Sequence, residues 1–354
     1  MRLLVVGASS EEICGVRACA QTLEPALTRA GAELETVWWE RSSGETTREF
    51  AERAAAAARA HQADATLWHY SVFSYGRRGI PFDVPMLARA LARPAPLVGF
   101  LHELAVDWRG RGGRGVVQAA MQRLALRRLV GTLAGAIVTT DARAVGLSKR
   151  VRVLSVPVPS NVPPVAQPRH DTDGLQVGVF GFRTDRIAAE TVTGGVAALA
   201  GARLVLVGAP GPDSPEAERW RQAATAAGCA LEFTGLLEPR ALSEALAGLD
   251  AVILPDPGGP TARRGTLAAA LAHGIPVVAF DGPKRWDLLA DAGAALLVPV
   301  EPTALATGLR ALAADPAARR ARGEAGRAFY ARTMAPDVVA AQILPFVELA
   351  RESR

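Results

Sequence analysis

Residues 251–280 (AVILPDPGGPTARRGTLAAALAHGIPVVAF) restrict the folds open to this chain more than any other stretch. Their first apolar run ends at Pro255, and the Pro- and Gly-rich residues 256–260 cannot continue a strand. An alanine-rich helical pattern comes next and ends at Gly274, and residues 275–280 form a second apolar run. This order predicts a strand–loop–helix–strand unit, which is a building block of α/β folds.

The loop of this unit combines glycines with two cations: Gly259 is followed by Arg263, Arg264, Gly265 and Thr266. Backbone N–H groups in the first turn of a helix have no intrahelical partner and carry partial positive charge. A phosphate group fits such a helix start, and two guanidinium groups would strengthen its binding. We therefore interpret the loop as the phosphate end of a nucleotide site. The competing interpretation is a solvated arginine pair, which the Gly-rich turn at a strand's carboxyl end makes less favourable.

Strands alternate with helices along the chain, which is the signature of parallel βαβ units with right-handed crossovers. The alternation restarts at residues 177–181, after a connector at residues 151–170 that contains five prolines and should be stiff and extended. We predict an α/β protein with two Rossmann-like, doubly wound domains facing across a cleft, a common place for a ligand. The predicted domains are residues 1–160 and 161–335, followed by a last helix in residues 336–354.

The positive charge is concentrated in one part of the chain. The formal net charge is +5, but residues 77–152 contain fourteen Lys and Arg against Asp83, Glu103, Asp107 and Asp141. This span could contact an anionic membrane surface, or it could reflect solvated arginines in a protein that uses arginine heavily. We favour the second interpretation. Nucleic acid is not an expected partner, because stacking aromatic residues are not interleaved with the basic ones.

The sequence also gives an expectation about the cellular compartment. No uninterrupted apolar stretch reaches about 18 residues, so we expect no membrane span. The N-terminus reads as a first strand rather than a signal peptide. Cys14, Cys19 and Cys229 form no ligand-spaced pair and suit a reducing compartment. We expect a cytoplasmic protein, with peripheral contact to the inner membrane face as the alternative, and leave its oligomeric state open.

The first half offers one candidate catalytic residue. His102 follows the apolar run of residues 96–101, at the carboxyl end of a predicted strand, where open α/β sheets bind ligands. The competing interpretation is a hydrogen-bonded structural histidine. Glu103 is adjacent, but neighbours on a strand point apart, so we do not assign it as a base.

Other loops at strand ends supply further candidates. Residues 71–81 carry Tyr75, Arg77 and Arg78 and read as an acceptor-binding loop, with an ordinary surface loop as the alternative. The second half offers Gly208 and the pair Arg183 and Arg186, although Arg186 could instead form a surface ion pair. Neither the glycine loop at residues 7–15 nor the loop that follows Gly208 has the G-x-G-x-x-G spacing of nicotinamide-binding proteins.

The chain resembles the family-4 glycosyltransferases of the GT-B fold over nearly its whole length. The resemblance rests on Gly15 in the first βα loop and on four segments. These are LVGFLHEL (97–104), VPSNVPP (158–164), FTGLLEPRALSEALAGLDAVILP (233–255) and GGPTARRGTLAAALAHGIPVVA (258–279). It implies retaining, metal-independent transfer of a sugar from a nucleotide diphosphate to an acceptor, without a cofactor. It also implies that the last helix, at residues 337–351, crosses back to the first domain.

The resemblance indicates which residues form the site, and it shows one difference between this chain and the family. The family has two glutamates with seven residues between them, and Thr261 and Ala269 occupy those positions here. Recognition of the donor sugar and ribose must therefore differ from the family or be lost. The same alignment puts residues 263–266 on the phosphate-facing loop and His102 near the reacting sugar. It puts Arg183 and Arg186 where an arginine and a lysine hold the diphosphate.

These expectations lead to three functional hypotheses. The first is a glycosyltransferase, hexosyltransferase-like, whose nucleotide sugar and acceptor small molecule or glycan suit bacterial polysaccharide or natural-product glycosylation. Its catalytic residues would be His102, Arg263 and Arg264, and its donor site would include Gly15, Gly208, Gly259, Gly265 and Thr266. The second is a non-catalytic sugar-nucleotide-binding protein of the same fold, and the third is a sugar-nucleotide epimerase. No metal is expected, because arginine can replace a cation at the diphosphate.

Overall fold

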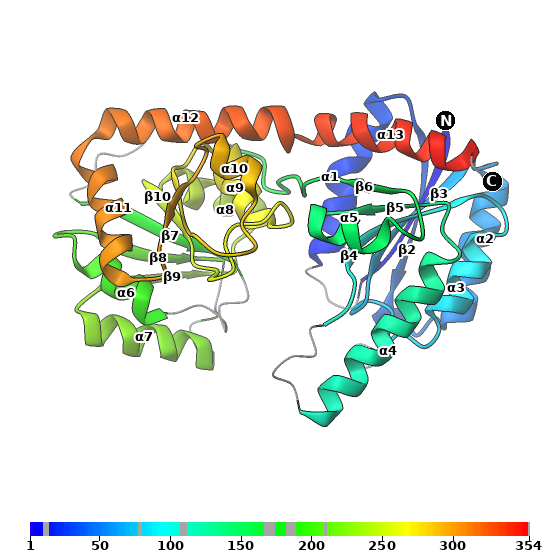
Figure 1. The fold of residues 1–354 in the computed structure, drawn as a ribbon, viewed down its shortest axis with the longest axis horizontal. Helices are drawn as coiled ribbons and strands as arrows, with labels where there is room; N and C mark the ends of the chain where they lie inside the picture. Colours follow the sequence, from blue (N-terminus) through cyan, green and yellow to red (C-terminus); the bar gives the residue numbers. More distant parts are fainter. Residues whose placement is uncertain are drawn as a thin grey trace. The chain divides into compact units, whose positions relative to one another are not determined.

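The computed structural model describes residues 1–9, 14–76, 80–106, 112–165, 174–181, 189–208, 211 and 213–352. The chain forms two compact units (Figure 1). Unit 1 comprises Met1–Pro157 and Pro336–Arg354, and unit 2 comprises Val158–Ala335. The sequence placed the first boundary at residue 160, slightly later in the same Pro-rich connector.

Unit 1 is built on a parallel six-stranded sheet in the order β2-β1-β3-β4-β5-β6. The strands are β1 (Arg2–Ser9), β2 (Glu33–Glu40), β3 (Ala65–Ser71), β4 (Leu97–Glu103), β5 (Gly135–Val138) and β6 (Val153–Ser155). The helices are α1 (Gly15–Arg29), α2 (Thr47–Ala60), α3 (Val84–Leu91), α4 (Gly113–Val130), α5 (Asp141–Leu147) and α13 (Pro336–Glu352), with the short 3₁₀ helix η1 (Arg41–Ser43). All seven residues of β3 are buried, as expected for a central strand of a parallel sheet covered on both faces.

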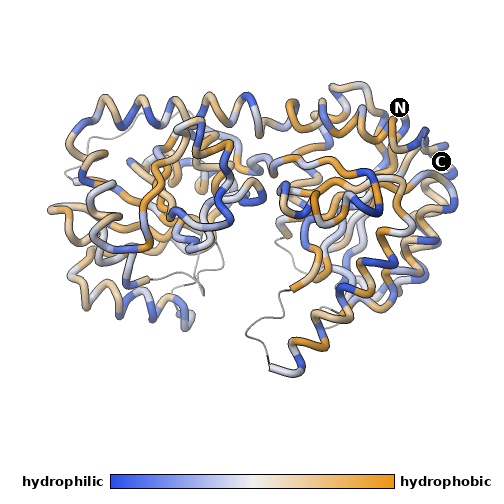
Figure 2. The backbone as a smooth tube through the Cα atoms, viewed as in Figure 1, coloured by the Kyte–Doolittle hydropathy of each residue, from blue (hydrophilic) through white to orange (hydrophobic). Residues whose placement is uncertain are grey.

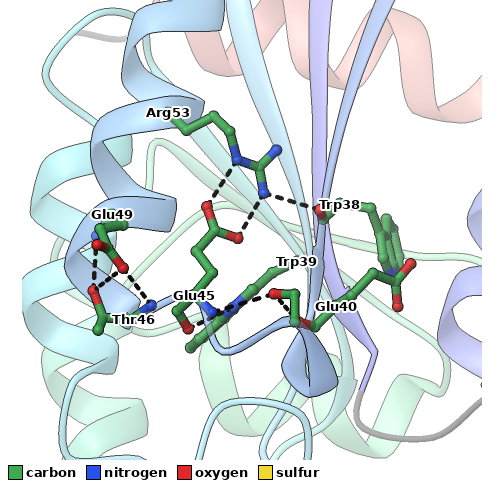
Figure 3. A network of polar contacts seen from close by, with 8 residues as sticks. Trp38, Trp39, Glu40, Glu45, Thr46, Glu49 and Arg53 are labelled. Carbon is green, nitrogen blue, oxygen red and sulfur yellow. Dashed lines mark hydrogen bonds and ion pairs between the residues drawn. The ribbon is translucent and has the colours of Figure 1, made fainter.

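A polar network fixes the turn between β2 and α2 (Figure 3). Thr46 and Glu49 form a capping box at the start of α2. Arg53 binds both carboxylate oxygens of Glu45 at 2.8 Å and donates to the Trp38 carbonyl at 3.1 Å. The surrounding residues line an open pocket of about 720 Å³. The network therefore holds the carboxyl end of β2 through side chains that already have partners.

Unit 2 has a second parallel six-stranded sheet, in the order β12-β11-β10-β7-β8-β9. The strands are β7 (Gln176–Phe180), β8 (Arg203–Val207), β9 (Ala230–Gly235), β10 (Ala251–Leu254), β11 (Val277–Phe280) and β12 (Leu296–Val298). The helices are α6 (Ala189–Ala197), α7 (Pro215–Ala227), α8 (Pro239–Ala247), α9 (Gly265–Ala272), α10 (Asp287–Asp291), α11 (Pro302–Ala314) and α12 (Pro316–Thr333). The chain returns from the edge strand β9 to pair β10 with β7, so the strand order reverses there. In open α/β sheets, ligands bind outside the carboxyl ends of the strands at such a reversal.

The α/β class and the doubly wound organisation predicted from the sequence are confirmed by these two sheets. Residues 251–280 form β10, the loop, α9 and β11 in the expected order. Gly274 follows the C-cap His273 with φ +66°, a left-handed conformation that favours glycine. Every residue of β10 and β11 is buried, so this element is central to the core of unit 2.

The last helix, α13, belongs to unit 1. Its apolar side chains Val339, Ile343, Phe346 and Val347 are buried, and it packs on α1 and β5. Arg29 binds Asp337 at 2.6 Å, and Arg351 lies 3.2 Å from Asp64. By length and composition the stretch Pro316–Glu352 could cross a membrane, which the sequence analysis did not anticipate. One face of α13 is buried against α1 and β5 of unit 1.

Candidate active site

In unit 2 the carboxyl end of β7 meets the start of α9. Gly181 directly follows β7, and its N–H donates to the Val207 carbonyl at 3.2 Å. A Cβ added to Gly181 would lie 3.3 Å from Thr266 Cγ2, and Gly181 has φ +134°. A side chain at position 181 would therefore be strained and would press against the first turn of α9. This glycine brings the backbone of β7 close to Thr266, one of the predicted donor-site residues.

Gly208 organises the next strand end. It follows β8 with φ +77°, and its N–H donates to Thr234 Oγ1 at 3.0 Å. An added Cβ would lie 3.3 Å from the Phe180 ring. Gly208 thus connects the carboxyl ends of β7, β8 and β9 at one edge of the sheet.

The start of α9 offers backbone donors to a ligand. Arg264 is the N-cap residue, and its own side chain does not cap the helix. The N–H groups of Gly265, Thr266 and Leu267 occupy the first turn, which has no intrahelical acceptors for them. The first turn carries no acidic residue. These groups give the helix start a partial positive charge that suits an anion.

The loop before α9 is held by its own hydrogen bonds. Asp256 accepts from the Gly258 N–H at 2.9 Å through one carboxylate oxygen and from the Arg264 guanidinium through the other. Lys284 N–H donates to the Gly258 carbonyl at 2.7 Å, and Trp286 N–H donates to the Pro260 carbonyl at 2.7 Å. The loop is therefore anchored at both ends, and Asp256 orients Arg264.

The remaining loop residues differ in their accessibility. Gly259 is buried at φ +91°, and a Cβ there would lie 2.9 Å from Arg285 Cβ, so it shapes the loop from inside. Arg263 is half-buried, and the Arg264 side chain is 42% exposed, which leaves its guanidinium within reach of a ligand.

The two positions where the family has glutamates are filled differently. Ala269 is fully buried in the core of unit 2. Thr261 Oγ1 is buried and has no hydrogen-bond partner within the described part of the chain. Neither residue can supply a carboxylate to a ribose or a donor sugar.

In unit 1, His102 is paired with a second histidine. His69 lies on β3 and His102 on the adjacent β4, and His69 Nδ1 is 3.0 Å from His102 Nε2. His102 stacks on the Phe100 ring at a centroid distance of 4.5 Å, and the His69 ring contacts Phe100 in a tilted arrangement at 5.0 Å. His69 is 1% exposed, whereas His102 is half-buried at the end of the strand.

Burial sets the protonation of this pair. It lowers the pKa of His69 to about 3. The pKa of His102 is also lowered well below its ordinary value, first by burial, then by repulsion from His69 when that ring is protonated, and then by the positive charge of Arg143. Both imidazoles are therefore neutral at neutral pH. One ring donates and the other accepts across the 3.0 Å contact, which fixes the tautomer of His102 relative to that of His69.

Arg143 holds the backbone beside the pair. Its Nη1 donates to the His102 carbonyl at 2.6 Å and its Nη2 contacts Glu103 at 3.1 Å. Glu103 is therefore engaged in an ion pair, consistent with leaving it out of the candidate bases.

The sequence analysis missed His69 and Arg143. His69 had a detectable signal, since it lies near the carboxyl end of the strand preceding the one that carries His102. Consecutive parallel strands often pair, and such pairing brings their ends together. Arg143 had no comparable signal, because its contact depends on the start of α5.

The other predicted residues have varied surroundings. Tyr75 is 3% exposed, and its hydroxyl accepts a hydrogen bond from Trp68 Nε1 at 2.7 Å, so we do not carry it into the acceptor site. Gly15 begins α1, and a Cβ added there would meet no atom of the described residues within 4 Å. Arg77, Arg78, Arg183 and Arg186 lie outside the described residues.

Side chains with metal-ligating groups do not converge in the part of the chain that the structure describes. Within it, no group of three or more His, Cys, Asp or Glu residues could hold a metal ion.

Comparisons with known proteins relate this architecture to sugar-transferring enzymes. Residues 186–315, in unit 2, match the family model described as glycosyl transferases group 1. The family-model match covers the start of α9 and the carboxyl ends of β8, β9 and β10. No curated protein sequence matches the chain.

Solved structures match over the whole chain. Sucrose-phosphate synthase from Thermosynechococcus elongatus has a TM-score of 0.72 at 17% identity, covering 99% of this chain and 100% of that chain. Anabaena HepE in complex with UDP and glucose has a TM-score of 0.70 at 14% identity, covering 99% and 100%. A putative UDP-N-acetylglucosamine 2-epimerase from Listeria monocytogenes has a TM-score of 0.61 at 14% identity, covering 100% and 98%. The likeness confirms the expected GT-B fold, whereas membership of family 4 stays a prediction.

Proposed function

Because this chain has the GT-B fold of glycosyltransferases and carries a group 1 glycosyl transferase domain, we propose that it transfers a sugar from a nucleotide-diphosphate sugar to an acceptor. The transfer retains the configuration of the sugar and needs no metal ion. Unit 2 binds the donor and unit 1 contributes to acceptor binding.

One observation carries the proposal: the start of α9, which lies within the matched residues 186–315 and is not capped by the side chain of its N-cap residue Arg264, adjoins Gly181. In sugar transfer from a nucleotide diphosphate, negative charge develops on the departing diphosphate. Donors that are already oriented toward that charge lower the barrier, because they need no reorganisation during the reaction. The N–H groups of Gly265 and Thr266 provide such donors.

Arg263 and Arg264 supply the cationic charge in this proposal. A guanidinium binds phosphate oxygens bidentately and stays charged at all relevant pH values. Asp256 holds Arg264 beside the helix start, so the arginine is positioned before the donor arrives. The two arginines thereby take the role that a divalent cation has in other sugar transferases.

UDP is the first nucleotide to test. HepE, whose structure resembles this one, was crystallised with UDP, with UDP and glucose, and with UDP-glucose. The missing glutamates at positions 261 and 269 mean that ribose and sugar contacts must come from other groups, so GDP, ADP and dTDP belong in the same panel.

The proposal is tested by calorimetric titration of the panel in the presence of EDTA. Wild-type protein should bind at least one nucleotide, and Arg264→Ala should weaken that binding by about 10-fold or more, the loss expected for a charge-assisted hydrogen bond. Arg240→Ala is the matched control, since Arg240 is an exposed arginine on α8 of the same unit and pairs only with Glu244 among the contacts described. Equal affinity of all three proteins would contradict the role of Arg264, and no binding of any nucleotide would contradict the donor site.

Two alternatives have specific support. The putative 2-epimerase among the structural neighbours favours an epimerase. The absence of both glutamates favours a protein that binds a sugar nucleotide without turning it over. Incubation with a sugar nucleotide and no acceptor distinguishes these functions: slow release of free sugar supports a transferase, an epimerised sugar nucleotide supports an epimerase, and an unchanged one supports a binding protein.

A further inference from the structure

The exposed side chains of α3 and α4, together with Phe82 just before α3, form a surface with unusual chemistry, called here the α3/α4 surface. Large apolar side chains lie open to solvent on it. Phe82 is 69% exposed, Val117 59%, Leu124 42% and Met86 41%. Isolated exposed apolar residues are ordinary, but several on neighbouring helices usually mark a binding surface.

The apolar residues of α4 share one face with arginines. Val117, Ala120 and Leu124 are exposed at spacings of three and four residues, which place them in one stripe along the helix. Arg127 and Arg128 are exposed and continue this stripe at the C-terminal end. Figure 2 shows hydrophobic and hydrophilic segments alternating along α4. The opposite face, with Ala119, Ala125 and Leu129, is buried against unit 1.

α3 repeats this arrangement. Phe82 and Met86 are exposed at its N-terminal end, and Arg89 is exposed three residues after Met86. α3 contacts α4 (Figure 1). Because both helices follow parallel neighbouring strands, their N-terminal ends lie at the same edge of the sheet. Phe82, Met86 and Val117 therefore lie toward one end of the surface, and exposed arginines lie at both ends, with Arg114 in the first turn of α4.

The charge of the surface has one sign. Neither α3 nor α4 contains an acidic residue. Asp83, the N-cap of α3, adjoins the surface and accepts a hydrogen bond from Thr47 at 3.2 Å. The surface includes Arg89, Arg127 and Arg128 from the basic span of residues 77–152. Solvated arginines alone, the interpretation favoured from the sequence, do not account for the apolar residues beside them.

We propose that the α3/α4 surface binds the surface of an anionic lipid bilayer. Apolar side chains gain free energy by entering the boundary between headgroups and acyl chains, and arginines gain it from anionic headgroups. Arginine stems can also extend from the apolar boundary to the headgroups. A protein partner would need a complementary acidic groove, whereas a bilayer supplies both chemistries over a wide, flat area. The inference is independent of the proposed sugar transfer.

The test is co-sedimentation of the full chain with phosphatidylcholine vesicles that contain or lack phosphatidylglycerol. The protein should bind the anionic vesicles, bind the neutral ones at least about tenfold more weakly, and dissociate as salt is raised because screening weakens its electrostatic attraction. No association with anionic vesicles at low salt overturns the proposal, including the case in which the protein instead forms a dimer.

Matched variants separate the contribution of the apolar side chains from that of the arginines. Val117→Glu and Leu124→Glu should each lower binding to anionic vesicles about tenfold, whereas Val145→Glu should not, although Val145 on α5 is 72% exposed. Arg127→Ala combined with Arg128→Ala should lower binding more than Arg320→Ala combined with Arg332→Ala, which removes the same charge from exposed positions on α12. Equal losses in test and control variants overturn the assignment to this surface. All these side chains are exposed, so circular dichroism should show unchanged folding.

Discussion

At the scale of single residues, His69 gives His102 a fixed proton arrangement. The two neutral rings share one hydrogen bond of 3.0 Å, and burial prevents His69 from taking a second proton near neutral pH. A histidine at a strand end can therefore keep one nitrogen oriented toward a ligand while its neighbour holds the other. His69 is in this sense a positioning residue for His102.

Replacement of His69 should affect turnover more than donor binding. His69→Ala leaves His102 Nε2 without its partner, so its ring and tautomer are less restricted and kcat should fall about tenfold. His69→Gln can still form a hydrogen bond to His102 and should retain more activity. Steady-state kinetics with the identified donor, together with calorimetric Kd values, measure both effects. A variant His69→Ala with unchanged kcat would contradict the positioning role.

The same pair predicts sensitivity to acid. The pKa of His69 is lower in the folded state than in the unfolded chain, so the unfolded state binds more protons between about pH 6.5 and pH 3. Its contribution to stability is fully present above pH 6.5 and falls as the pH drops through this range, by about 1.4 kcal/mol per pH unit.

Urea unfolding at pH 7 and pH 5 measures this loss. The free energy of unfolding should decline more steeply for the wild type than for His69→Gln, which removes the titrating group. Equal slopes for the two proteins would show that His69 does not bind an extra proton on unfolding.

At the scale of elements, the approach of β7 to α9 controls the donor site. Gly181→Ala introduces a Cβ 3.3 Å from Thr266 Cγ2 at a backbone conformation that other residues rarely adopt. It should cost about 1–3 kcal/mol of stability and also weaken nucleotide binding by displacing the first turn of α9.

Gly228→Ala is the matched control for this element. Gly228 ends α7 with φ +67°, and a Cβ added there would have no atom of the described residues within 4 Å. The Gly228→Ala variant should also lose stability, because alanine is strained at this positive φ, but it should keep its affinity for the nucleotide. If thermal unfolding and calorimetry show that both variants bind equally well, the close approach at Gly181 does not shape the site.

The sequence predicted the elements better than the contacts between them. Residues 251–280 contain the breakers, the alanine-rich helix and Gly274, and these local signals determine β10, α9 and β11 in order. By contrast, the pairing of Arg264 with Asp256, the burial of Tyr75 and the contact of His69 with His102 depend on how separate elements pack. α5 carries Arg143 beside His102, a contact that no local pattern indicates.

At the scale of the whole molecule, the proposed functions are assigned to two different α/β units. Unit 2 contains the matched domain and the α9 site, whereas unit 1 contains the histidine pair and the α3/α4 surface. The doubly wound class followed from strand–helix alternation, and the Pro-rich connector marked the division between the units. Net charge indicated a basic region, but only the exposed positions of the apolar side chains gave that region a structural meaning.

Ligand binding should stabilise the whole chain measurably. A nucleotide at about 100 times its Kd adds about 2.7 kcal/mol to the native state if it does not bind the unfolded chain. UDP in the presence of EDTA should therefore raise the Tm measured by differential scanning fluorimetry. The Arg264→Ala variant should need more UDP for the same rise. An increase in Tm that requires magnesium or manganese would contradict metal-independent donor binding.

The most direct test of the account is a crystal structure of the chain with UDP. The proposed function requires the diphosphate oxygens to accept hydrogen bonds from the backbone N–H groups of Gly265 and Thr266, with the guanidinium of Arg263 or Arg264 on the same oxygens. Electron density that puts the diphosphate elsewhere, with the first turn of α9 bound only to water, would contradict it.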